Sequence, residues 1–328
     1  MKSSILRAAV IAGCLLSAAT TGISTAHAGS YPDKPLKLVV GFPPGGPTDI
    51  IGRIIGRALA DNLGQPVVVE NKGGAGGTIA SRSVATSDAD GYTLLVSVES
   101  SQTRGAALNK TLPYDPVNDF TFIGKLAKQT NLLVVNPKLP VNNVKELIDY
   151  AKSHPGELNY SGTYGATSHL GGALFDINNQ TKMTFISYPG GAQPITDLIG
   201  GVVQVGFFSE ATVAQHVKSG TLKALAVAAK EPSEMFPDLP TLQQAGAAPM
   251  DISPWFGLVA PDGIPKEALD RLSQAVSEIT KSSSFNQQLK NIGASAILNS
   301  TPKSFHSDVQ NEIAYWKKLV ADANLTVN

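Results

Sequence analysis

Short apolar runs alternate with segments whose apolar residues recur at helical spacing along most of this chain. The run Leu36–Val40 is rich in β-branched residues and predicts a buried strand. It is followed by FPPGGP, which can continue neither a strand nor a helix, and then by apolar residues at helical spacing up to Leu59. Leu36–Leu59 therefore predicts a strand, a tight loop and a helix.

The same alternation continues downstream. Further strands are predicted, with helices between most of them, at Val67–Glu70, Tyr92–Val98, Leu158–Ser161, Thr184–Tyr188, Val202–Phe208 and Leu222–Ala228. Strands that alternate with helices imply parallel sheets covered by helices on both faces. In open sheets of this kind ligands lie beyond the carboxyl ends of the strands, so the loops that follow strands are the candidate binding loops.

Two segments break the alternation. The proline-spaced linker LPYDPVNDF precedes two strands, Phe120–Leu126 and Leu132–Val135, that have no helix between them, as expected where a chain crosses between domains. Ser253–Val259 is extended and apolar, which predicts a second crossover. Three helices, at Pro265–Lys281, Phe285–Ile292 and Pro302–Asp322, are expected beyond it and to pack back on the first lobe.

A chain of 328 residues exceeds the size at which one core normally divides, so two domains are expected. We predict one lobe from residues 29–128 plus 253–328 and a second lobe from residues 129–252.

Residues 1–28 predict a secretory signal peptide. Lys2 and Arg7 form a basic segment, Ala8–Ala19 is apolar, and Ala26-His27-Ala28 is an A-x-A cleavage site. Cleavage after Ala28 would start the mature chain at Gly29 in the periplasm.

The alternative is a lipoprotein. Ile11-Ala12-Gly13-Cys14 resembles a lipobox, in which Cys14 would carry the anchor, although the apolar segment before it is short. Without Cys14 the mature chain has no cysteine and hence no disulfide or thiol chemistry.

Composition excludes several functions. Lys+Arg and Asp+Glu are both 26, no basic stripe is present, and aromatic residues are 6% of the chain, so a nucleic-acid partner is not expected. The sequence has no G-x-S-x-G or H-E-x-x-H motif, and its histidines lack metal-ligand spacing. We therefore predict no catalytic residue, no metal and no cofactor.

The loop before the first helix suits an anion. Gly46 or Thr48 is the expected N-cap, and Asp49 lies in the first turn. Backbone N–H groups at a helix start have no intrahelical partner, and Pro47 has none to donate, so Gly46, Thr48 and Asp49 are the expected donors. An ordinary strand–helix turn with a good cap explains the same residues.

The second candidate loop, Glu99–Gln102, follows the third strand. Its hydroxyl and amide groups can donate to a carboxylate, whereas Glu99 would repel one unless it points away. Arg104 fits a solvated helix face better than a ligand clamp. The cluster Gly73–Gly77 lacks both the G-x-G-x-x-G register and the lysine of a P-loop, so we interpret it as a strand–helix connection.

A glycine loop repeats the opening pattern in the second half of the chain. Residues 162–169 (GTYGATSH) join a strand to a helix that carries Leu170, Leu174 and Phe175. Two anion-receptive helix starts, one in each lobe, predict a ligand held between the lobes. A structural role is the simpler interpretation of His169, the only histidine in a candidate loop.

Spaced motifs over the whole mature chain resemble one family. YPDKP, FPPGGPTDI, LGQPVVVENKGGAGG, DGYTLL, LPYDPVNDF, the glycine loop ending in TSHL, and WFGLVAP are similar to the extracytoplasmic solute receptors of tripartite tricarboxylate transporters, also called Bug proteins. The resemblance implies an α/β, type II periplasmic binding protein fold, in which two lobes joined by two crossover strands close on a small carboxylate. It also implies delivery to membrane permease subunits and, in our interpretation, a monomer.

Matching the family's motifs to this sequence implies ligand-binding positions at Phe42, Gly46, Thr48, Asp49 and Ser101 in the first lobe, and at Gly165, Ala166, Thr167, Ser168, Tyr188 and Gly190 in the second. Our own interpretation of the loops after strands adds Ser100, His169, Phe208 and Ser209. In this family backbone amides and bridging waters characteristically contact the carboxylate.

Two departures from the family's pattern bear on the ligand. Phe208-Ser209 stands where many members have Asp-Asn, and Tyr188 is followed by Pro-Gly-Gly where Tyr-Lys-Gly is frequent. Both changes remove polar or charged groups, so we predict a ligand with an apolar or aromatic body rather than an amino or dicarboxylic acid. The alternatives to a transport receptor are an exported enzyme acting on a small organic acid and a ligand sensor for a membrane signalling protein.

Overall fold

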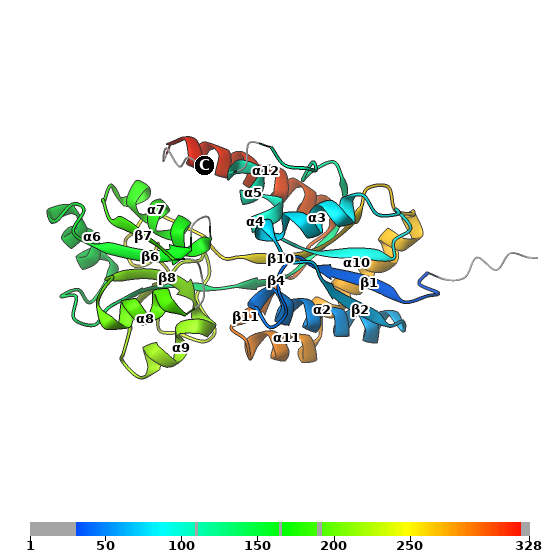
Figure 1. Ribbon diagram of the computed structural model, residues 1–328. Coiled ribbons are helices and arrows are strands. Elements are labelled where there is room, and N and C mark those ends of the chain that lie inside the picture. Colours follow the sequence, from blue (N-terminus) through cyan, green and yellow to red (C-terminus); the bar gives the residue numbers. More distant parts are fainter. Residues whose placement is uncertain (1–30, 109–110, 164–165, 189–191, 323–328) are drawn as a thin grey trace, which may run out of the picture.

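The computed structural model, which describes residues 31–108, 111–163, 166–188 and 192–322, contains two sheets, each covered by helices on both faces (Figure 1). We call each sheet with its helices a lobe. The predicted α/β fold with two lobes is confirmed.

The first lobe is built on a six-stranded sheet with the order β11-β4-β10-β3-β1-β2. Its strands are β1 (Leu36–Val40), β2 (Val67–Asn71), β3 (Thr93–Val98), β4 (Phe120–Gln129), β10 (Trp255–Pro261) and β11 (Ala294–Ala296). Strands β1, β2 and β3 are parallel, and β10 lies antiparallel between β3 and β4.

The residues of β1 point alternately to the two faces of this sheet. The helices and the short η1 turn of this lobe are α2 (Pro47–Leu63), η1 (Ala75–Gly77), α3 (Thr78–Ala85), α4 (Glu99–Gln102), α5 (Arg104–Leu108), α10 (Lys266–Lys281), α11 (Ser283–Lys290) and α12 (Pro302–Asp322). Leu38 and Val40 belong to the hydrophobic cluster that includes residues of α2, α10 and α11, whereas Val39 belongs to the cluster that includes residues of α3 and α12.

The second lobe has a five-stranded sheet with the order β7-β6-β8-β5-β9. Its strands are β5 (Asn131–Val135), β6 (Asn159–Thr163), β7 (Thr184–Tyr188), β8 (Val205–Ser209) and β9 (Lys223–Val227). Helices α6 (Val144–Ser153) and α7 (Thr167–Asn179) cover one face, and α8 (Gln193–Gly200) and α9 (Glu210–Lys218) cover the other.

The chain passes between the lobes twice. Only Thr130 separates β4 from β5, and the return segment runs into β10. The two passes are hydrogen-bonded to each other: the Gln129 amide donates to the Pro254 carbonyl at 2.9 Å, and the Asn131 side chain donates to the Ile252 carbonyl at 2.8 Å. Both predicted crossovers are therefore present.

Strand pairing shows which edges of the sheets face this junction. Val98, the last residue of β3, pairs with Phe256 near the start of β10. Ser209, the last residue of β8, pairs with Asn131, the first residue of β5. The carboxyl ends of the parallel strands in each sheet thus lie at the edge nearest the other lobe, as Figure 1 shows.

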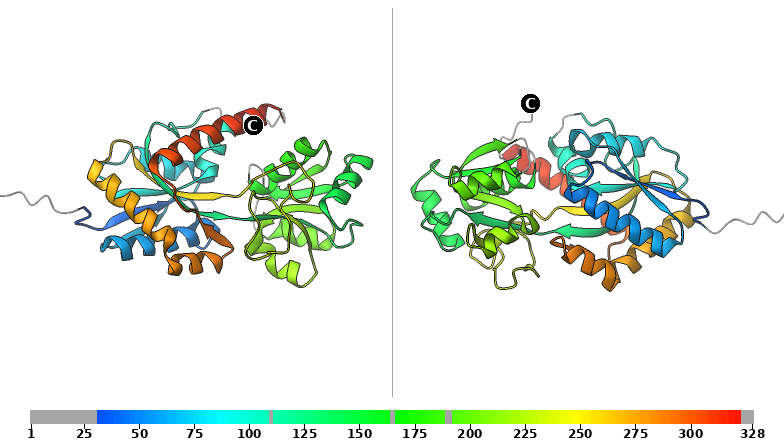
Figure 2. Two further views of the ribbon diagram at one scale, coloured as in Figure 1. Left: turned by 180° about the vertical axis from the view of Figure 1, so that it is seen from behind. Right: turned by 60° about the horizontal axis from the view of Figure 1, so that its bottom comes forward.

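Helix α12 contacts both lobes, which the sequence did not predict. Phe305, Val309 and Ile313 pack on the first lobe, whereas Trp316 and Leu319 belong to a cluster made mostly of second-lobe residues. Figures 1 and 2 show the red α12 lying along the first lobe with its end reaching toward the second. The expectation that this helix packs only on the first lobe was incomplete.

Candidate functional site

Three loops of the first lobe converge on Gly77. A Cβ atom added at Gly77 would lie 3.3 Å from the Ser101 Cβ and 3.4 Å from the Phe42 ring. The backbone φ of Gly77 is +97°, a conformation that side chains with a Cβ rarely adopt. Ser100 also donates a hydrogen bond to the Gly76 carbonyl at 3.0 Å. Loops after β1, β2 and β3 therefore meet at one point on the carboxyl edge.

This convergence brings together three predicted site residues, Phe42, Ser100 and Ser101, and adds one that was missed. Gly77 was interpreted as part of a strand–helix connection only. Its position directly after a strand was the available signal, because loops at the carboxyl ends of parallel strands share one edge.

Helix α2 begins as predicted, with Gly46 as its N-cap. No side chain caps this end, so the amides of its first turn, including that of the half-buried Thr48, have no intrahelical acceptor. The α2 N-terminus thus presents backbone donors on the same edge as Gly77.

The Asp49 carboxylate is held by hydrogen bonds from other residues of the protein. It is 2% exposed and accepts hydrogen bonds from the Gly45 amide at 2.8 Å, from Arg53 Nε at 2.9 Å and from Asn71 Nδ2 at 2.8 Å. Burial favours the neutral acid, but these hydrogen bonds outweigh it and lower the pKa of Asp49 to about 2. Asp49 therefore fixes the loop against β2, and only its backbone amide is available to a ligand.

The segment after β3, predicted as a loop, forms the single helical turn α4. Tyr114 donates to the Ser101 carbonyl at 2.6 Å, and Ser97 donates to the Gln102 side chain at 3.0 Å. Ser101 is 2% exposed, and its hydroxyl donates to the Val98 carbonyl at 3.3 Å. One turn of helix is not stable alone, so these tertiary contacts hold α4 in place.

Arg104 was predicted to lie on a solvated helix face, and this is wrong. It is 5% exposed, lies 5.9 Å from the centre of the Trp316 ring, and forms a 3.3 Å ion pair with the equally buried Glu99. The partner that buries it is distant in sequence, so no local pattern could show it. Arg104 is therefore directed at Glu99 and Trp316 rather than at solvent.

In the second lobe, the loop after β6 leads into α7. Ala166 is the N-cap, Thr167 begins the helix, and the Ser168 hydroxyl accepts a hydrogen bond from the Thr163 amide at 3.2 Å. Ser168 lies so close to Gly162 that a Cβ there would be 2.6 Å from its hydroxyl. Gly165 lies outside the described residues.

His169 is buried in the first turn of α7. It is 4% exposed, and its ring centre is 4.1 Å from that of Phe185. Burial disfavours the charged imidazolium and lowers the pKa of His169 to about 4. The side chain is consequently neutral at physiological pH.

The remaining predicted residues lie at the ends of β7 and β8. Tyr188 donates to Asp197 at 2.7 Å; burial and this hydrogen bond raise the pKa of Tyr188 to about 12. Phe208 is half-buried over Gly206. Ser209 is the N-cap residue of α9 but makes no side-chain capping hydrogen bond, and its hydroxyl donates to that of Thr212 at 3.2 Å. Gly190 lies outside the described residues. That these residues bind a ligand stays a prediction.

Stability is expected to fall by about 3 kcal/mol as the pH is lowered from 6.5 to 4, because of His169. Its pKa is below the ordinary 6.5 in the folded chain, so in this window the unfolded chain binds more protons. Urea unfolding at several pH values should show the loss in the parent chain and a smaller slope in His169→Gln. Equal slopes would contradict a neutral buried imidazole.

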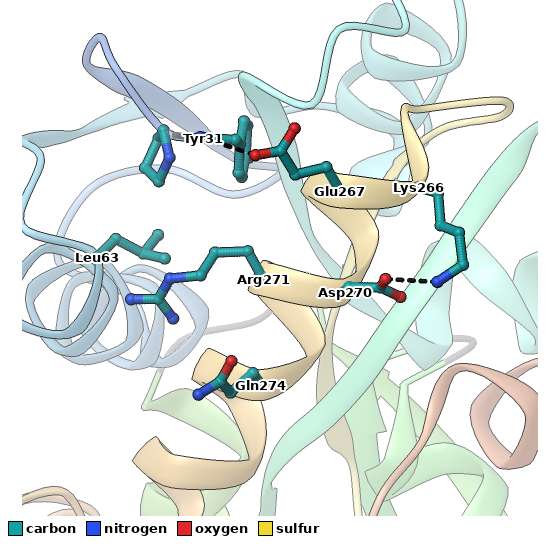
Figure 3. Close-up of a pocket in the computed structure, with 8 residues that line it drawn as sticks. Tyr31, Leu63, Lys266, Glu267, Asp270, Arg271 and Gln274 are labelled. Carbon is teal, nitrogen blue, oxygen red and sulfur yellow. Dashed lines mark hydrogen bonds and ion pairs between the residues drawn. The ribbon is translucent and has the colours of Figure 1, made fainter. Parts of the chain in front are cut away.

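The end of the first lobe farthest from the second lobe also carries a pocket, of about 700 Å³ (Figure 3). It lies between Tyr31, Leu63 at the end of α2, and α10. Arg271 points from α10 toward α2, where it donates to the side chain and carbonyl of Asn62. Tyr31 precedes β1, so this pocket lies at the amino edge of the sheet, away from the converging loops.

The described residues lack two features. No helix among them is long and apolar enough to cross a membrane. In the same part of the chain, no group of three or more His, Cys, Asp or Glu side chains is arranged to hold a metal ion.

Sequence comparison identifies the family. The model of the tripartite tricarboxylate transporter family receptor matches residues 51–325. The chain belongs to this receptor family. The resemblance inferred from the motifs is thus confirmed, and this tripartite tricarboxylate transporter receptor is a member of a family of solute receptors rather than of enzymes.

Individual relatives agree with the family match. Protein BugT of Bordetella pertussis is 35% identical over 307 residues, which cover 93% of this receptor and 94% of BugT. The structure of R. palustris Rpa4515 with adipate has a TM-score of 0.77 at 33% identity, covering 90% of this receptor and 98% of that chain. MatC (Rpa3494) from Rhodopseudomonas palustris with bound malate has a TM-score of 0.73 at 31% identity, with coverage of 88% and 100%.

Proposed function

We propose that this receptor captures a small organic carboxylate in the gap between its lobes and delivers it to the membrane permease subunits of a tripartite tricarboxylate transporter. The observation that supports this most directly is the facing of the two carboxyl edges, each of which carries a glycine loop and an uncapped helix start. Relatives with bound adipate and malate support a carboxylate as the ligand class.

Backbone donors can supply the required affinity. A dissociation constant of about 1 μM corresponds to about 8 kcal/mol. Hydrogen bonds to a charged group contribute about 1.5 to 3 kcal/mol each, so a few of them together with burial of an apolar body suffice. Arg53 forms an ion pair with Asp49, Arg104 is buried against Glu99, and His169 is neutral, so recognition by amides rather than by a free side-chain cation fits these residues.

We propose an apolar or aromatic ligand body. Phe42, beside Gly77, and Phe208, at the end of β8, are both half-buried. These rings offer apolar surface on each lobe, where a charged or strongly polar body would lose hydration.

The proposed site acts in the periplasm as a two-lobe clamp. Cleavage after Ala28 would release the chain there, and residues 29–128 plus 253–328 would move against residues 129–252 about the two crossovers. The leader and Cys14 lie outside the described residues, so the mature N-terminus is to be determined by mass spectrometry. A start at Gly29 would reject lipidation at Cys14.

A thermal-shift and calorimetric screen tests the ligand class. Phenylacetate and hexanoate, monocarboxylates with apolar bodies, are expected to bind more tightly than the dicarboxylates adipate and malate and more tightly than aspartate or citrate. A ligand at 100 times its dissociation constant stabilises by about 2.7 kcal/mol, which raises Tm by about 5 °C. Tight binding of aspartate or citrate with none of the apolar-bodied acids would reject the proposed ligand body, and binding of no carboxylate would reject the function.

Two single substitutions test whether the carboxylate binds at the start of α2. Thr48→Val, in the first turn of α2, is expected to weaken carboxylate binding by at least fivefold, because it removes the side-chain hydroxyl that can donate a hydrogen bond to the carboxylate. Thr86→Val is the matched control, since Thr86 follows α3 at the opposite edge of the sheet and donates only to the Arg82 carbonyl. Equal effects of the two substitutions would place the ligand elsewhere.

A further inference from the structure

A second cavity, of about 530 Å³, lies on the crossover side of the molecule. Its walls come from α4, β4, β10 and α12 of the first lobe and from residues 249–253, the segment that returns from the second lobe. The volume is in the range of small-molecule sites, which are common at junctions between domains. None of the residues proposed above to bind the carboxylate lines this cavity.

Acidic groups outnumber basic groups in its lining. Lys125 is buried between Asp308, at 2.9 Å, and Glu312, at 3.2 Å, so two carboxylates face one ammonium. Lys128 is paired with Glu231, outside the lining, at 2.5 Å. The charges left over by these pairs are negative.

Two further side chains in the lining carry opposite charges. Asp251 and Lys230 are both exposed, and within the described ranges neither forms an ion pair. The Asp251 carboxylate accepts only the Ser253 amide, at 3.0 Å, among these residues. Lys230 can be replaced without breaking an interaction, which makes the two residues suitable for opposite tests of ligand charge.

Two buried oxygens in the lining residues have no hydrogen-bond partner. They are Oε2 of Glu99 and Oγ of Ser253. Glu99 is 7% exposed; its Oε2 is 3.3 Å from Arg104, but the contact lacks hydrogen-bond geometry. An ionised Glu99 can only accept, and a buried acceptor without a donor is costly. The Ser253 hydroxyl can also accept, so a ligand that donates hydrogen bonds would satisfy both atoms.

Aromatic rings complete the walls. Trp255, Tyr315 and Trp316 all line the cavity, and Trp255 already has the Lys125 ammonium 5.0 Å from its ring centre. Aromatic faces attract cations and also accommodate an apolar body. The excess negative charge, the unsatisfied acceptors and the aromatic walls all favour a ligand that is a cation, donates hydrogen bonds and has an apolar body.

We propose that this crossover cavity is a second ligand site, which binds a small organic amine as its ammonium ion. The ammonium lies toward Asp251 and Glu99, and the apolar body contacts Tyr315 and Trp316. Because its walls come from both sides of the crossover, an amine bound there biases the relative position of the lobes.

The test uses 2-phenylethylamine as the probe and 3-phenylpropionate as its anionic counterpart, titrated calorimetrically into the full mature chain. Saturable amine binding is expected at millimolar or lower concentration. Asp251→Asn, which keeps the acceptor of the Ser253 amide, is expected to weaken amine binding at least fivefold. Lys230→Gln, which removes a like charge, is expected to leave it unchanged or strengthen it about twofold.

The pH dependence gives a second readout. Burial, followed by the attraction of Arg104 and the repulsion of Glu312 and Asp251, leaves the pKa of Glu99 raised to about 8. Glu99 therefore gains its charge as the pH rises toward 8, and amine binding is expected to tighten between pH 6 and 8. Glu99→Gln should remove this dependence.

Thr48→Val separates this proposal from the carboxylate site, since it is expected to weaken carboxylate binding and leave amine binding unchanged. The proposal is overturned by absence of saturable amine binding, by loss of amine binding in Thr48→Val, or by insensitivity to both Asp251→Asn and Lys230→Gln. Weaker binding in Lys230→Gln with stronger binding in Asp251→Asn would instead identify an anion site. Amine binding that changes as expected in these variants supports the amine site even if no carboxylate binds to the receptor.

Discussion

Replacing Asp49 with alanine is expected to lower the free energy of unfolding by about 2 to 4 kcal/mol and to weaken carboxylate binding at least tenfold. Its carboxylate accepts three hydrogen bonds, from Gly45, Arg53 and Asn71, at the loop that leads into α2. Without it, the three donors lose their shared acceptor and the loop is no longer fixed to β2. Urea unfolding and calorimetry measure the two effects.

Two control variants distinguish the contribution of the Asp49 hydrogen bonds from that of its ion pair with Arg53. Asp49→Asn keeps an acceptor oxygen and should lose about half as much stability. Arg53→Gln should cost less than about 1 kcal/mol, because the Arg53 side chain is 52% exposed and water screens its ion pair. Equal losses in all three variants would show that the ion pair, not the loop hydrogen bonds, is the main contribution.

The same carboxylate predicts acid sensitivity. Its folded-state pKa of about 2 is below the ordinary 3.8, so its contribution is fully present above pH 3.8 and is lost as the pH falls through 2. The difference between the parent chain and Asp49→Asn should therefore shrink over that interval. A constant difference would contradict a charged Asp49.

Replacing Gly172 with alanine is expected to destabilise the second lobe by about 2 to 3 kcal/mol, although alanine normally favours a helix interior by up to about 1 kcal/mol. A Cβ at this position of α7 would lie 2.2 Å from the Tyr160 ring of β6. Either the ring or the helix must move, and movement of α7 displaces its first turn, which contains Thr167 and Ser168. Weaker carboxylate binding is expected together with the loss of stability.

Gly200→Ala is the matched control, since a Cβ at this helical position of α8 meets no atom within 4 Å. It is expected to be neutral or slightly stabilising. Tyr160→Leu should recover part of the loss in the Gly172→Ala background, because it removes the ring that the new methyl group meets. Failure of this suppression would assign the loss to the backbone rather than to the clash.

Most strands and helices could be predicted because their apolar patterns are local. Thr184–Tyr188 matches β7, and Leu36–Val40 matches β1. Short elements were not predicted: α4 has a single turn and β11 has three residues, too few to show a periodicity. Both are held by contacts with distant segments, such as Tyr114 on α4 and the pairing of β11 with β4.

The candidate site could be predicted only in outline for the same reason. Glycines and helix starts after strands identified the loops, but the contact of Gly77 with Ser101 joins residues from different strand–helix units. Asp49 was assigned to a ligand because its local context suits one, whereas Asn71, 22 residues away, holds its side chain. The burial of Arg104 depends in part on Trp316 of α12.

The position of β10 has a consequence for the order in which the chain folds. This strand is the common neighbour of β3 and β4, yet it begins at Trp255, after all five strands of the second sheet. As the polypeptide emerges from its N-terminus, the second sheet is complete while β3 and β4 still lack the strand that joins them. The half of the molecule that starts first is thus finished last, and its unpaired strand edges stay exposed to other chains until residue 261 has emerged.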